Sequence, residues 1–180
     1  YKAMKTVANR YAHPKHNFNF SGRCPLPIEQ LAKEIKSVSE RRFIPQEIIY
    51  SIMQIETAGR CLAVRKEHDG TWSLGLFQVN TRSTSVPACH GWQLKMIKQS
   101  KTVASLKNPK LRCLRNPVVN LEVAASILRE KYASVNDRKQ PSTYRWDLME
   151  TQARDDWRKA LAAYSGGQAY VFQAYYDIMD

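Results

Sequence analysis

Residues 45–59 read PQEIIYSIMQIETAG, and this stretch decides what kind of fold the chain can adopt. Pro45 suits the first turn of a helix, and Gly59 suits its end. The residues between them are apolar on nearly all sides of a helix, namely Ile48, Ile49, Ile52, Met53 and Ile55. A helix of this composition belongs in a protein interior. The stretch therefore predicts a buried central helix with one carboxyl group, Glu56, near its end.

The apolar residues on both sides of this helix also recur mostly at helical spacing. They predict further helices in the ranges 25–38, 118–132, 156–164 and 170–179. The polar range 136–146 is typical of a loop, whereas residues 64–80 carry a turn sequence followed by a Gly-centred segment, which favours β structure. We therefore predict a mainly α fold, an α+β domain with a helical bundle and one small β-hairpin or sheet.

The composition bounds the class of protein. A chain of 180 residues with 43% hydrophobic and 24% charged residues can bury one core, so we expect a single folded domain from residue 25 to 180 after an irregular extension, residues 1–24. No apolar run approaches the ~20 residues that a membrane span needs. The net charge of +12 attracts polyanions, but the basic residues are dispersed, which also suits a solvated surface.

The four cysteines are Cys24, Cys61, Cys89 and Cys113. They form no CxxC pair and have no His at zinc-ligand spacing, so we expect no metal site. Their even number and wide spacing favour two disulfides in an oxidising compartment, with four thiols in a reducing compartment as the alternative. Three pairings are open, and we expect Cys24 with Cys61 and Cys89 with Cys113.

Glu56 is the first candidate for chemistry. A carboxyl group among apolar neighbours holds its proton to higher pH, as a general acid must. The alternative is a residue at a helix end that turns its carboxylate to water.

Two later segments could complete a site around Glu56. The segment from Ser73 to Asn80 places Gly75, Gln78 and Asn80 beside apolar anchors, where backbone and amide groups could line a sugar cleft. The segment ALAAYSGG around Tyr164 puts a hydroxyl group at a helix end. Taken alone, the first is equally typical of a short buried strand, and the second of a helix cap with a packed aromatic ring.

Together and in this order, these segments resemble the lysozyme-like superfamily. The resemblance is to the soluble lytic transglycosylase domain and its relatives that open the cell wall for type IV secretion. It covers residues 25–179 and is carried by four motifs, which are Glu56-Thr57, Gly75-Leu76-Phe77-Gln78-Val79, Asn120-Leu121 and Ala163-Tyr164-Ser165-Gly166-Gly167. The chain departs from the family pattern at four positions, with Thr57 for Ser, Phe77 for Met, Ala124 for Gly and Ser165 for Asn.

The resemblance implies an enzyme that cuts peptidoglycan strands with Glu56 as its catalytic acid, without cofactor or metal. Residues that it implies for substrate binding or for orienting Glu56 are Thr57, Ser73, Gly75, Gln78, Asn80 and Tyr164. Hydrolytic animal lysozymes have a second carboxylate two positions before the Gly of the strand motif, where this chain has Ser73. The resemblance therefore favours a lytic transglycosylase, which closes the sugar's own 6-hydroxyl into a 1,6-anhydro end.

Two alternatives stay open on the sequence. A goose-type hydrolytic lysozyme would recruit an Asp, for example Asp69 or Asp147, to hold a water molecule. A basic cell-wall-binding module would have no activity. The expected partners are peptidoglycan strands, with a secretion or conjugation assembly as a further candidate, no nucleic acid and no membrane span. We expect a monomer in the periplasm or secreted.

Overall fold

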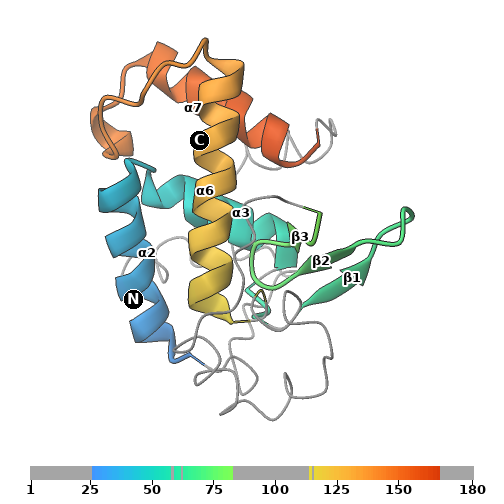
Figure 1. Ribbon diagram of the computed structural model, residues 1–180. Coiled ribbons are helices and arrows are strands. Elements are labelled where there is room, and N and C mark those ends of the chain that lie inside the picture. Colours follow the sequence, from blue (N-terminus) through green and yellow to red (C-terminus); the bar gives the residue numbers. More distant parts are fainter. Residues whose placement is uncertain (1–25, 58, 62, 83–113, 115, 167–180) are drawn as a thin grey trace.

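The computed structural model describes residues 26–57, 59–61, 63–82, 114 and 116–166. Within them the fold is mainly helical, with a small antiparallel sheet on one side of the helices (Figure 1). The α-helices are α2 (Ile28–Arg42), α3 (Gln46–Thr57), α6 (Pro117–Val135) and α7 (Thr151–Tyr164), and a 3-10 turn spans Trp146–Leu148. The predicted fold class is confirmed.

Helix α3 lies in the interior, as its sequence predicts. Its buried residues include Ile48, Ile52 and Met53, each at most 2% exposed. The helix ends where Gly59 adopts a positive φ of 81° and its N–H reaches back to the carbonyl of Met53. This ending suits glycine, because other residues are strained at such a φ.

Helix α6 is the centre of the helical body, and α2 and α7 both pack against it (Figure 1). Asn116 caps its first turn by accepting hydrogen bonds from the N–H groups of Val118 and Val119. Near its other end Tyr132 packs against Trp157 of α7, with ring centroids 4.4 Å apart. Both rings are at most 1% exposed, so they fix how α7 lies on α6.

The sheet contains β1 (Val64–Lys66), β2 (Trp72–Leu74) and β3 (Val79–Asn80) in the order β1-β2-β3. Arg65 lies opposite Ser73, and Ser73 opposite Asn80. Because side chains alternate between faces, these three share one face, while Leu74 and Val79 point to the core from the other.

The largest difference between a predicted and an observed helix boundary is at the start of α7. Helix α7 begins at Thr151, five residues before the predicted start at Asp156. An aspartate is common at helix starts, but Asp156 is buried inside the helix and bonds to Lys139 and Gln152. The predicted helix 170–179 and the extension 1–24 lie outside the described residues.

Candidate active site

The end of α3 is joined to the loop between β2 and β3. Thr57 is 2% exposed, and its hydroxyl group donates hydrogen bonds to the carbonyls of Leu76 (2.9 Å) and Met53 (3.2 Å). Glu56 therefore lies one residue from a direct tie between the central helix and the Gly-Leu-Phe-Gln loop. Substrate contact by Thr57 stays a prediction.

The same loop is held from the other side by α6. Asn120 is fully buried and accepts a hydrogen bond from the N–H of Phe77 (2.9 Å), while its amide group donates to the carbonyls of Leu74 (2.7 Å) and Leu114 (2.8 Å). Gly75 passes so close that a Cβ atom there would lie 2.4 Å from the Asn120 Nδ2. Gly75 also has a φ of 76°, so only glycine fits without strain.

Tyr164 brings the end of α7 to this junction. Its hydroxyl group donates a 2.8 Å hydrogen bond to the carbonyl of Phe77. Part of the residue is exposed, yet burial of the hydroxyl group and the negative charge of Glu56 raise the pKa of Tyr164 well above its ordinary value. Tyr164 is thus a neutral hydrogen-bond donor beside Glu56. Glu56 itself is half-buried. Its environment thus lies between the two that its sequence position allowed, which are apolar surroundings and exposure to water.

The remaining predicted residues lie on the sheet and its loop. Gln78 has a φ of 48° and its amide donates to the carbonyl of Gly75 at 3.1 Å. Asn80 donates to Thr71 Oγ1 at 2.9 Å. Both side chains are half-buried, so each keeps some surface for a ligand. The predicted residues therefore gather around one loop, which α3, α6 and α7 all contact.

Glu67 belongs to this region and was missed by the sequence argument. The Ser73 hydroxyl group donates a 2.5 Å hydrogen bond to Glu67 Oε1. That bond, opposed by partial burial and aided by Arg65, holds the pKa of Glu67 below its ordinary value. The sequence argument considered only the residue at position 73 itself and not a carboxylate from the neighbouring strand beside it. The only signal in the sequence is that Glu67 and Ser73 are six residues apart on either side of a turn. This spacing predicts a contact only when the register of the two strands is known.

Of the two aspartates considered for a hydrolytic site, only Asp69 lies near the sheet. Asp69 is in the β1–β2 turn, where it accepts hydrogen bonds from Thr71 and Arg82. Asp147 pairs with Arg145 and acts electrostatically on Glu47, in the first turn of α3. Glu47 and Glu56 are nine residues apart, or roughly 14 Å along the helix.

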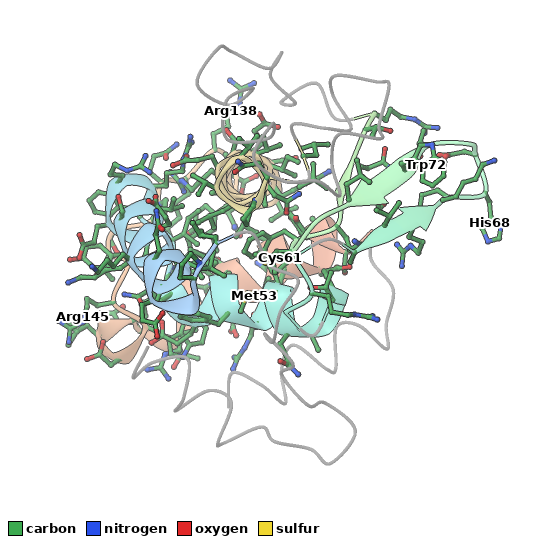
Figure 2. The ribbon with its side chains drawn as sticks, turned by 90° about the horizontal axis from the view of Figure 1, so that it is seen from below. Met53, Cys61, His68, Trp72, Arg138 and Arg145 are labelled. Atoms are coloured by element: carbon green, nitrogen blue, oxygen red, sulfur yellow. The ribbon has the colours of Figure 1, made fainter. Side chains whose placement is uncertain are left out.

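Figure 2 shows the molecule from below and labels Arg145, the partner of Asp147. Arg145 lies on the opposite side of the molecule from His68, at the tip of the β1–β2 hairpin. Asp147, which is bonded to Arg145, therefore lies far from the tip of this hairpin. The position of Asp147 near the start of α3 argues against the role suggested for it.

Of the four cysteines, only Cys61 lies among the described residues. Cys61 is disulfide-bonded, but Cys24, Cys89 and Cys113 lie outside the described residues, so the pairing stays a prediction. Across the described ranges, no three His, Cys, Asp or Glu side chains are grouped in a way that could hold a metal ion. None of the helices that the structure describes is both long and apolar enough to cross a membrane.

Comparison with known proteins gives one match. A family model described as the transglycosylase SLT domain matches residues 33–175, which include all the predicted site residues. Neither the curated proteins nor the solved structures gave a match.

Proposed function

We propose that this chain, which belongs to the transglycosylase SLT domain family, is a peptidoglycan lytic transglycosylase with Glu56 as its single acid–base group. The observation that carries the proposal is the junction at which Tyr164, whose pKa is raised by the charge of Glu56, bonds to the loop of residues 75–78. This junction presents one carboxyl group and several hydrogen-bonding side chains at the edge of a small sheet. Such an arrangement suits a polar, uncharged polymer such as a sugar chain.

The reaction divides into two proton transfers at Glu56. The Glu56 carboxyl group first gives its proton to the β-1,4 glycosidic oxygen between MurNAc and GlcNAc, and the bond from that oxygen to the anomeric carbon breaks. The resulting Glu56 carboxylate then takes the proton of the sugar's 6-hydroxyl as this oxygen bonds to the anomeric carbon. The product is a 1,6-anhydro end, and no water is consumed.

Ring closure is favoured because the 6-hydroxyl is already tethered beside the anomeric carbon. An intramolecular nucleophile gains an effective concentration that free water cannot match unless the protein activates it. Tyr164, held neutral by its raised pKa, orients Glu56 and the loop, while Ser73, Gln78 and Asn80 are proposed to contact the glycan.

The place of action follows from the substrate. Peptidoglycan lies outside the cytoplasmic membrane, so we propose a periplasmic or secreted location, with a secretion or conjugation assembly as the partner that recruits the enzyme. The net charge of +12 would hold the enzyme near an anionic wall, more weakly at high salt.

A second outcome, hydrolysis, is favoured by one observation. Glu67 places a carboxylate beside Ser73, near the position where hydrolytic animal lysozymes carry their second acid. Two carboxyl groups on opposite sides of a sugar can activate water. Products with free reducing ends would identify this outcome.

The first prediction tests Glu56. Glu56→Gln keeps the shape of the side chain but has no proton to give, so release of muropeptides from purified peptidoglycan should fall at least ~100-fold. Mass spectrometry should find abundant 1,6-anhydro-muramic ends in the wild-type digest and almost none in the Glu56→Gln digest. Glu47→Gln, at the other end of α3, is the matched control and should digest normally. Wild-type rates for a folded Glu56→Gln variant would contradict the proposal.

A further inference from the structure

One face of the sheet carries a row of polar side chains. Arg65, Ser73 and Asn80 share this face because they are paired across the strands. Glu67 lies two residues after Arg65, and Thr71 two before Ser73, so alternation extends the same face toward the turn. Hydrogen bonds from Ser73 to Glu67 and from Asn80 to Thr71 confirm that these side chains meet.

The Glu67 carboxylate is held by one of its two oxygens. Oε1 accepts from the Ser73 hydroxyl group (2.5 Å) and from Arg65 Nε (2.9 Å). Within the residues that the structure describes, Oε2 takes no hydrogen bond. Ser73 is only 4% exposed to solvent, whereas the Glu67 side chain is 24% exposed. The carboxylate is therefore anchored from inside and has one oxygen available to a ligand.

We propose that Glu67 is the second carboxylate of the glycan site, with Oε2 directed at the sugar whose glycosidic bond is cut. This inference rests on the proposed function. Glu67 exchanges no proton and forms no bond. Its negative charge stabilises the positive charge that develops on the sugar ring when the bond to the leaving oxygen breaks.

The chain connectivity links Glu67 to the end of α3 that carries Glu56, which supports a position beside the same sugar. Ser73, the anchor of Glu67, is two residues before Gly75, and the loop that begins there is bonded to Thr57 and to Tyr164. Thr57 is the neighbour of Glu56 in the chain, and the charge of Glu56 raises the pKa of Tyr164. The two carboxyl groups thus lie on elements joined through one short loop.

The two groups have opposite requirements. Glu56 must carry a proton at the start of the reaction, whereas a charge-stabilising group must be ionised. The bond from Ser73, followed by the contribution of Arg65, outweighs partial burial and lowers the pKa of Glu67, which keeps it ionised into mildly acidic solution. Pairs of carboxyl groups with separated pKa values are typical of glycosidases.

The test uses soluble glycan strands and three variants. Glu67→Gln keeps the hydrogen bond from Ser73 but loses the charge, so kcat should fall ~10-fold or more while KM changes less than ~3-fold. Ser73→Ala keeps the carboxylate but removes its anchor. The pKa of Glu67 then rises, and the acidic limb of the kcat profile should move to higher pH. Glu40→Gln, on the exposed side of α2, is the matched control.

The outcomes separate this inference from the proposed function. If the wild type cleaves the strands and Glu67→Gln has wild-type kcat, or Ser73→Ala leaves the acidic limb in place, Glu67 has no such role although the enzyme assignment stands. If the wild type releases no products, the proposed function fails and this inference falls with it. Should Glu67→Gln not fold, the pH profile of Ser73→Ala decides.

Discussion

Asn120 and Asn136 lie at opposite ends of α6, and each uses a buried amide to hold backbone from another part of the chain. Asn120, in the first turns, is completely buried and satisfied, with hydrogen bonds to Phe77, Leu74 and Leu114. Asn136, just after the helix, donates to the carbonyls of Tyr132 and Asp156, while its Oδ1 has no partner among the described residues.

The difference shows how one helix serves two purposes. The Asn120 end fixes the backbone of the loop that carries Gly75 and Gln78, so any change there reaches the site directly. The Asn136 end fixes α7 near Asp156, eight residues before Tyr164. A change at Asn136 should therefore lower stability with little effect on the chemistry of properly folded molecules.

The largest loss of stability is expected for Gly75→Ala. The new Cβ would lie 2.4 Å from Asn120 Nδ2 and 2.8 Å from the carbonyl oxygen of Leu114, which is backbone and cannot swing away. Left-handed backbone costs a further ~1–2 kcal/mol for a residue other than glycine. With the Asn120 bonds disturbed, the free energy of unfolding should fall by about 4 kcal/mol in urea titrations.

Gly70→Ala is the control for backbone strain alone. Gly70 has a similar φ of 82°, but nothing lies within 4 Å of its Cβ position. Gly70→Ala should therefore lower the free energy of unfolding by only ~1–2 kcal/mol, the cost of left-handed backbone. Equal losses at the two positions would show that the close approach of Gly75 to Asn120 is unimportant.

The next prediction tests the comparison of Asn120 with Asn136. Asn120→Ala leaves three buried backbone groups without their amide partner, and about 3 kcal/mol of stability should be lost. Asn136→Ala, which removes two bonds, should lose ~1–2 kcal/mol. Measured at a temperature where both variants are folded, kcat on soluble glycan strands should fall for Asn120→Ala and stay near wild type for Asn136→Ala. Equal kcat values would remove the distinction between the two ends of α6.

The sequence predicted the parts of this molecule that depend on local pattern. The apolar run from Ile48 to Ile55 identified the central helix, and the order of Glu56, Gly75, Asn120 and Tyr164 identified the family. Glu67 escaped prediction because its contact with Ser73 exists only in the register of β1 and β2. Asp147 was misplaced because sequence order does not reveal that it faces the start of α3.

The contacts of Asp156 could not be predicted from sequence order either. They lead to the smallest expected effect. The Asp156 side chain is 6% exposed and accepts hydrogen bonds from Lys139 Nζ (2.8 Å) and Gln152 Nε2 (2.9 Å). Burial alone would raise the pKa of Asp156, but the bonds from Lys139 and Gln152 outweigh it, and the pKa lies below the ordinary value. The ionised form is therefore the one that favours the folded state.

Lys139→Met should lower Tm at pH 7 by less than Asn136→Ala does, because Lys139 is largely exposed and Gln152 remains in place. A carboxyl group whose pKa is lowered on folding stabilises the protein above the ordinary pKa, ~3.9 for Asp, and this contribution is lost as the pH falls through the folded-state pKa. The Tm difference between wild type and Lys139→Met should therefore shrink as the pH falls below ~4 and approach zero near pH 2. Lys33→Met, on the exposed side of α2, should show no such dependence in the same calorimetric series. A Tm difference that is the same at every pH would mean that Lys139 acts by packing its alkyl chain, and that its charge does not stabilise Asp156.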